Sequence, residues 1–161
     1  EISGSEWLKF GFFSILLIES VKQLTDKIMP ETINNELKPS IAILEFKSSF
    51  NNQNFEQYIQ NILFESFFST GKYKLIERNN IDKILVEQKF QLSGNVNDES
   101  AKSIGHIIGV DYVCYGTILE LNDSLKINGK VTNMHFVLHS KKPITINYRQ
   151  LRPLFNPLVV S

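Results

Sequence analysis

The stretch from Tyr73 to Gly116, YKLIERNNIDKILVEQKFQLSGNVNDESAKSIGHIIGVDYVCYG, decides the fold of this chain. It predicts a strand, two helices separated by the Ser-Gly turn at 93–94, and a buried strand after Gly109. Asn80 and Asn97 are the expected helix starts, because an asparagine side chain accepts hydrogen bonds from the free amides of a first turn. Gly109 is the expected stop of the second helix.

The sequence on either side of this stretch completes an α/β pattern. Ile41–Phe46 (IAILEF) is a short apolar run that suits a buried strand, and apolar residues recur at helical spacing from Phe55 to Phe67. Val110–Leu121 and Leu125–Thr132 predict a β-hairpin across a polar turn. Two helical crossovers favour parallel pairing of the early strands. We therefore predict one α/β domain with a mixed sheet and helices on both faces.

The most apolar run, Trp7–Ile18, leaves three alternatives open. It is shorter than the roughly 20 residues that span a bilayer, and Lys9 interrupts it. It fits the remnant of a signal or anchor segment, an interfacial membrane helix, or the start of an amphipathic helix docked on the domain. Apolar residues continue at helical spacing to Ile28, which favours docking. Peripheral membrane attachment through this N-terminus is kept as an expectation.

Charge is balanced overall but unevenly distributed. The 161 residues contain 17 basic and 17 acidic side chains, which gives no argument for a nucleic-acid partner. From Ser124 onward there is no acidic residue, and residues 1–123 carry a formal net charge of −6. The basic residues of this C-terminal part are Lys126, Lys130, Lys141, Lys142, Arg149 and Arg152. They predict either a solvated strand and tail or a weakly basic face for an anionic partner.

No residue pattern predicts catalysis, a cofactor or a metal site. The single cysteine, Cys114, excludes an internal disulfide, and its place between two strand residues indicates a buried hydrophobe instead of a nucleophile paired with His106. His135 and His139 are four residues apart in a segment without helical character, so they do not share a helical face. No glycine-rich phosphate loop follows a strand.

Residues 40–134 resemble the curli-secretion CsgG-like family. The matching elements are IAILEF (41–46), TGKYKLIER (70–78), NNIDKILVEQKFQLSG (79–94), NDESAKSIGHIIGVDYVCYGTI (97–118) and KINGKVTNM (126–134). The resemblance implies an α/β domain of anticodon-binding-like topology, similar to the N-terminal domain of the periplasmic TolB protein. Relatives include the curli channel, penicillin-binding-protein activator lipoproteins and flagellar outer-membrane accessory proteins, none of which is an enzyme.

The resemblance also implies a set of motif residues, most of which are expected to maintain the fold. They are Glu77, Arg78, Ile84, Glu87, Gln88, Gly94, Ala101, Gly105, Gly109, Asp111 and Gly116.

Two departures from the family limit what it implies. No insertion long enough for membrane-spanning β-hairpins interrupts the domain, so a pore role is not expected for this chain alone. Beyond Phe136 no closing helix or strand of the family type is evident, and Pro143, Pro153 and Pro157 indicate an irregular tail. The predicted division is an N-terminal helix and linker (1–39), a CsgG-like domain (40–136) and a basic, proline-containing tail (137–161).

We therefore expect a non-enzymatic envelope protein that binds a protein partner, or associates with itself, at the periplasmic side of the outer membrane. The candidate contacts are the loop residues Phe50, Asn52 and Gln53, and the tail residues Lys141, Lys142, Arg149 and Arg152. One alternative is a subunit of an oligomeric curli-type secretion assembly. A second is a small-ligand sensor with a pocket at the carboxyl ends of the parallel strands.

Overall fold

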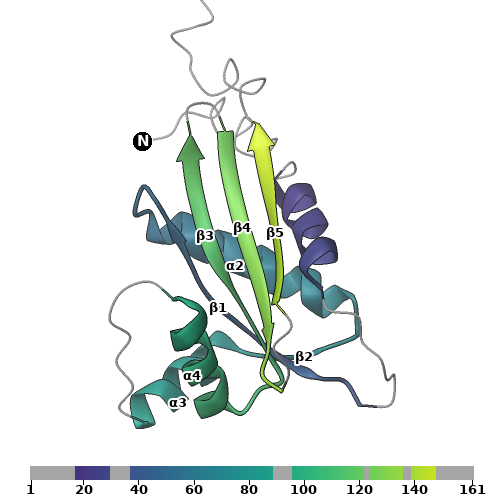
Figure 1. The fold of residues 1–161 in the computed structure, drawn as a ribbon, viewed down its shortest axis with the longest axis vertical. Coiled ribbons are helices and arrows are strands. Elements are labelled where there is room, and N and C mark those ends of the chain that lie inside the picture. Colours follow the sequence, from purple (N-terminus) through teal and green to yellow (C-terminus); the bar gives the residue numbers. More distant parts are fainter. Residues whose placement is uncertain (1–16, 30–36, 89–95, 122–123, 136–138, 148–161) are drawn as a thin grey trace, which may run out of the picture.

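A five-stranded mixed sheet organises the chain in the computed structural model (Figure 1). The structure describes residues 17–29, 37–88, 96–121, 124–135 and 139–147. A helix over residues 17–28 comes first. The elements that follow are β1 (Ser40–Ser48), α2 (Gln53–Ser69), β2 (Lys74–Ile76), α3 (Arg78–Glu87), α4 (Asp98–Ile108), β3 (Tyr112–Leu121), β4 (Ser124–Asn133) and β5 (His139–Asn147).

The strand pairing agrees with the order of elements along the chain. The sheet order is β2-β1-β3-β4-β5, with β1 parallel to both β2 and β3. β3 and β4 form the predicted antiparallel hairpin, in register from Tyr112 opposite Asn133 to Leu121 opposite Ser124. The predicted parallel pairing through two helical crossovers is confirmed.

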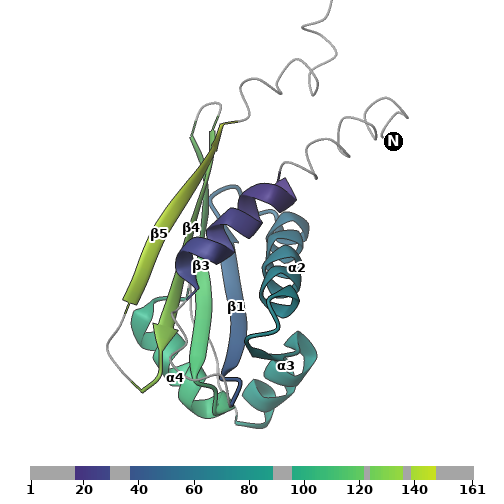
Figure 2. The same ribbon diagram turned by 90° about the vertical axis from the view of Figure 1, so that its right-hand side faces the viewer.

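Helices lie on both faces of the sheet, as predicted, and α3 and α4 cover only one end of their face (Figure 2). Helix 17–28 and α2 pack on one face, over Ile41, Ile43, Cys114 and Ile127. α3 and α4 pack on the other face, over a smaller cluster that includes Leu44. Burial on both sides explains why β1 is almost continuously apolar in sequence.

Helix 17–28 docks along its apolar stripe, which confirms the docked-helix prediction for this part of the N-terminal run. Leu17, Val21, Leu24 and Ile28 are fully buried at helical spacing. Leu24 and Ile28 lie over Gly129 of β4, where an added Cβ would come within 3.1 Å of the Ile28 side chain. Because Gly129 has no side chain, helix 17–28 can pack closely on β4 at this point. Residues 7–16 of the run lie outside the described residues.

A register shift in β1 explains how Phe46 reaches the larger core. Ile41 and Ile43 face that core, whereas Ala42 and Leu44 face the smaller one. The pairing with β3 then shifts between Ile43 and Phe46, so Phe46 returns to the larger core and is fully buried there. Bulges of this kind re-aim side chains by adding one residue to a strand.

Two sequence predictions are wrong in detail. Helix α3 begins at Arg78, with Glu77 as its N-cap instead of Asn80, because the Glu77 carbonyl already accepts from the amides of Asn80 and Ile81 at 3.0 and 3.1 Å. Residues 139–147 form β5, where an irregular tail was expected. β5 pairs antiparallel with β4 and places Pro143 on an edge strand, where the missing N–H of proline is tolerated. The Asn97 and Gly109 caps of α4 are confirmed.

Candidate partner-binding surface

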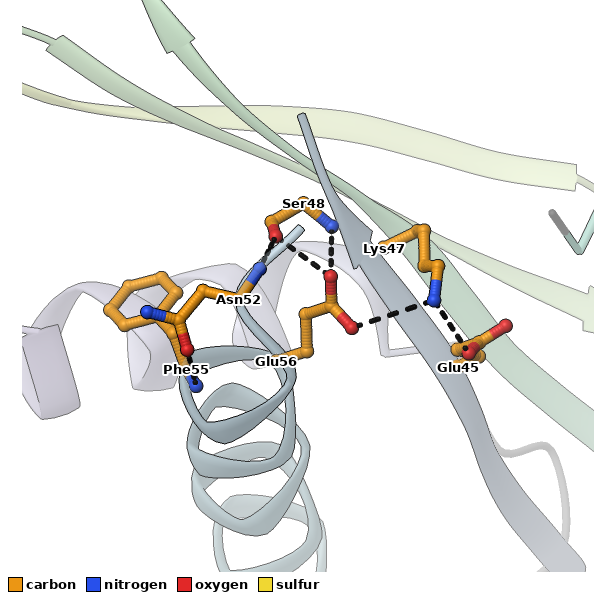
Figure 3. Close-up of polar contacts among 6 residues, drawn as sticks. All are labelled: Glu45, Lys47, Ser48, Asn52, Phe55 and Glu56. Carbon is orange, nitrogen blue, oxygen red and sulfur yellow. Dashed lines mark hydrogen bonds and ion pairs between the residues drawn. The ribbon is translucent and has the colours of Figure 1, made fainter. Parts of the chain in front are cut away.

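The junction between β1 and α2 carries the predicted loop contacts (Figure 3). Asn52 is the N-cap of α2, and its side-chain oxygen accepts from the Phe55 amide at 3.1 Å. Asn52 and Gln53 are exposed, while Phe50 is half-buried against the Phe55 ring with centroids 5.6 Å apart. The loop therefore offers exposed polar side chains on a backbone that the cap and the aromatic pair hold in place.

Glu56 in the first turn of α2 holds the junction together by hydrogen bonds to Ser48. Its carboxylate is buried, and Oε1 accepts from both the Ser48 amide at 2.8 Å and the Ser48 hydroxyl at 2.7 Å. The Ser48 hydroxyl oxygen in turn accepts from the Asn52 amide at 3.0 Å. One buried carboxylate thus ties the end of β1 to the first turn of α2, because a charged acceptor strengthens each of these hydrogen bonds.

An ion-pair chain continues from Glu56 along the strand. Lys47 Nζ lies 3.8 Å from Glu56 Oε2 and 3.4 Å from Glu45 Oε1. The Glu45 and Lys47 side chains are each about a third exposed, so solvent screens this pair. These charges lie beside a groove of about 430 Å³ between α2 and α3. The polar side chains that line this groove include Glu45, Gln57, Gln60, Asn61, Arg78 and Asp82.

The family-motif residues at α3 lie on its exposed surface. Glu77, Glu87 and Gln88 are exposed, and Gln88 is the C-cap residue of the helix. Arg78 Nε is ion-paired with Asp82 Oδ1 at 3.2 Å, one turn further along. Of this group only Arg78 lines the groove. Ile84 is half-buried on the same helix, and Gly94 lies outside the described residues.

The glycines of the motif allow close packing or a left-handed turn. Gly109 has a φ of 77° at the end of α4, where side chains other than glycine are strained. Gly105 faces β3 and Met134, and an added Cβ would lie 2.5 Å from the Met134 sulfur. At Gly116 an added Cβ would overlap the Asn128 backbone oxygen. Ala101 is fully buried in the smaller core.

Asp111 joins three chain segments. Its Oδ2 accepts from the Ser40 amide at 2.8 Å and the Ser40 hydroxyl at 2.9 Å, and Oδ1 lies 2.8 Å from His135 Nε2. The hydrogen bond from the Ser40 backbone, followed by that from His135, lowers the pKa of the Asp111 carboxyl below its ordinary value. Asp111 therefore links the starts of β1 and β3 to the segment that directly follows β4.

The predicted contact residues Lys141 and Lys142 do not lie near the predicted contact loop at residues 50–53. Lys141 and Lys142 lie on β5, opposite Lys130 and Gly129. Three strand spacings separate β5 from β1, which is roughly 14 Å across the sheet. The loop and β5 are therefore two separate candidate surfaces, and Arg149 and Arg152 lie outside the described residues.

Cys114 lies in the larger core, fully buried, and burial raises the pKa of its thiol. Its position agrees with the interpretation as a core residue. In the described residues no group of three or more His, Cys, Asp or Glu side chains is arranged to hold a metal ion. Within the same part of the chain, no helix is long and apolar enough to cross a membrane.

Sequence reasoning missed a partly buried polar cluster at the start of α4. Asp98 accepts a hydrogen bond from the Tyr115 hydroxyl and is ion-paired with Lys130, whose side chain is 8% exposed. Burial, followed by the hydrogen bond to Asp98, raises the pKa of Tyr115. The alternation of the β3–β4 hairpin could have placed Tyr115 and Lys130 as a cross-strand pair, but it does not predict that α4 covers them.

The architecture defines a class of small α/β domains with a mixed sheet between two helical layers. Residues 14–142 match the family model described as curli production assembly/transport component CsgG, and the chain therefore belongs to this family. No curated protein sequence matches the chain.

Solved structures of LpoB share the fold. The LpoB C-terminal domain from Salmonella enterica superposes with a TM-score of 0.67 at 10% identity, covering 81% of this chain and 98% of that one. The same domain from Escherichia coli gives 0.62 at 10% identity, covering 80% and 97%. The solution structure of E. coli LpoB gives 0.55 at 13% identity, covering 76% of this chain and 64% of that one. At these identities the likeness establishes the fold.

Proposed function

We propose that this chain is a non-enzymatic accessory protein of the bacterial cell envelope that binds a protein partner at the periplasmic side of the outer membrane. The observation that carries the proposal is the family match over residues 14–142. The near-complete coverage of the LpoB C-terminal domain supports it, because the shared part is a whole folded domain and not a fragment.

The polar groups of the candidate surface support a binding role. The Glu45, Glu56 and Asp82 carboxylates are all engaged with neighbouring side chains or amides. Of these contacts, the buried hydrogen bonds between Glu56 and Ser48 hold the junction in one shape, which limits the entropy lost when a partner docks. The exposed Asn52 and Gln53 side chains lie at the start of α2, next to this junction, and are proposed as partner contacts.

Cell location and contact are tested together in the source bacterium with the native N-terminus. A photo-crosslinking amino acid replaces Gln53 in one variant and Ser103, which is exposed on α4 across the sheet, in a matched control. Protease added to cells with an opened outer membrane should degrade the protein, and Gln53 should yield a discrete crosslinked partner that Ser103 does not. A protein that stays protected with the cytosolic fraction would overturn the proposal.

A second candidate is a subunit of an oligomeric secretion assembly. The family description as an assembly and transport component favours it, and so does a sheet whose end strands are β2 and β5. Light scattering on the protein with its native N-terminus separates the two candidates. A monomer or dimer supports the accessory role, whereas a discrete multimer of many subunits supports a secretion ring.

A further inference from the structure

The outer edge of β1 is only partly paired. β2 pairs with Ser40, Ile41 and Ala42 and then ends at Ile76, where the chain turns into α3 (Figure 1). From Ile43 onward β1 has β3 on one side, and no strand in the described part of the chain pairs with the other side. Unpaired strand edges present backbone N–H and C=O groups that can pair with another chain.

The far end of this free edge is closed by Glu56. The Ser48 amide is bonded to the Glu56 carboxylate, so the available backbone runs from Ile43 to Lys47. At the usual rise per residue this is roughly 16 Å, long enough for an extended peptide of about five residues. Such a peptide would occupy the position that a longer β2 would have filled.

The groove between α2 and α3 lies along this same edge. Ile43 and Glu45 of β1 contribute to its lining, together with Ile76 at the end of β2. The opposite wall is the polar side of α2, with Gln57, Gln60 and Asn61. Amide side chains beside a free strand edge can accept and donate hydrogen bonds to an added backbone and its side chains.

The charge of the groove favours a basic occupant. Three carboxylates line it, from Glu45, Glu56 and Asp82, against the single guanidinium of Arg78. Arg78 is already paired with Asp82, and Lys47 is shared between the other two carboxylates. The Glu45 side chain is 27% exposed and belongs to β1 itself, so it would lie next to an added strand.

We propose that the Ile43–Lys47 edge of β1 binds an extended segment of a partner protein by strand addition, with a Lys or Arg side chain of that segment directed at Glu45. This inference rests on the proposed function and names how the partner would be recognised. In strand addition the main-chain hydrogen bonds provide affinity, and side-chain pockets provide specificity.

A synthetic peptide of alternating Thr and Lys, seven residues long and capped at both ends, serves as the probe for the full chain. Hydrogen exchange of those amides between Ile43 and Lys47 that do not bond to β3 should slow at least fivefold when the peptide is present at millimolar concentration. A peptide of the same sequence with N-methylated backbone amides should bind at least tenfold more weakly, because it cannot form the ladder. Slowed exchange confined to β5 or α4, or none at all, would overturn the proposal.

Charge recognition is tested with a matched pair of substitutions. Glu45→Lys should weaken peptide binding about tenfold, whereas Glu65→Lys, an equal charge change on the exposed surface of α2, should leave it within twofold. Equal effects of the two substitutions would mean that binding depends only on the net charge of the protein, and would overturn the assignment of Glu45.

A mass that rises with protein concentration, and falls when peptide is added, would identify a second copy as the occupant instead. If the Gln53 crosslink persists while the peptide fails, only this inference fails.

Discussion

Replacing Glu56 by alanine tests the central support of the candidate surface. The carboxylate is 3% exposed and accepts two hydrogen bonds from Ser48, which is itself 4% exposed. The alanine variant leaves a buried amide and hydroxyl without this acceptor. A glutamine keeps an acceptor oxygen in the same place and removes only the charge.

The magnitude follows from these two hydrogen bonds. Hydrogen bonds to charged groups contribute about 1.5–3 kcal/mol each, and water entering the vacated space recovers part of the loss. We expect Glu56→Ala to lower the free energy of unfolding by about 3 kcal/mol and Glu56→Gln by about 1 kcal/mol. The Lys47 contact adds little, because the pair is 3.8 Å apart and Lys47 is partly exposed. In a chain of this size 3 kcal/mol corresponds to roughly 6–12 °C in Tm.

Urea unfolding followed by far-ultraviolet circular dichroism measures these changes. The midpoint should fall in the order wild type, Glu56→Gln, Glu56→Ala, with an unchanged dependence on urea. Glu65→Ala, on the exposed side of the same helix, is the control and should stay within about 0.5 kcal/mol of wild type. An alanine variant as stable as this control would refute the role given to Glu56.

Three further predictions concern the fold around the surface. Gly116→Ala should destabilise the domain by about 3 kcal/mol or more, because its Cβ would overlap the Asn128 carbonyl oxygen in the paired strand. Leu24→Ala should remove about 3 kcal/mol by opening a cavity under helix 17–28, measured by urea unfolding. The pKa of Asp111 is lowered from 3.8, so its contribution to stability is present above that value and is lost as the pH falls through the folded-state pKa. Asp111→Asn should therefore flatten the acid side of the stability profile, measured by urea unfolding from pH 7 to pH 2.

Each of these predictions has a matched control in the chain. Gly129→Ala should be milder than Gly116→Ala, because its Cβ would meet only movable side chains at 3.1 Å or more. Leu37→Ala, at a side chain 86% exposed, should change stability by less than about 0.5 kcal/mol. Asp82→Asn removes an exposed i,i+4 ion pair and should leave the acid-side slope of Asp111 in place. Equal effects within any pair would contradict the corresponding argument.

The sequence predicted those features that depend on neighbouring residues alone, such as helix caps, helical crossovers and tight turns. Asn97 caps α4 and Gly109 ends it with a positive φ, both at positions that favour only a few residue types. The parallel pairing of the early strands followed from helical crossovers, and the β3–β4 hairpin from alternation and a polar turn.

The remaining features depended on contacts between distant residues. Glu56 looks like any acidic residue near a helix start, and only its approach to Ser48 makes it a buried support. β5 was missed because Pro143 argues against a strand, unless the strand is known to lie at an edge. The start of α3 moved to Glu77 because β2 ends at Ile76 and the chain must turn at once.

Glu56 links the two proposed modes of partner binding. Ser48, which it holds, directly follows the free β1 edge, and its hydroxyl oxygen accepts the hydrogen bond from the Asn52 backbone amide. Within the sheet the main-chain groups are paired between strands, so those that a partner can reach lie at strand edges and in loops. Glu56→Gln should therefore weaken both the peptide protection at Ile43–Lys47 and the Gln53 crosslink, since both rest on one carboxylate. Loss of one without the other would show that the edge and the loop bind independently.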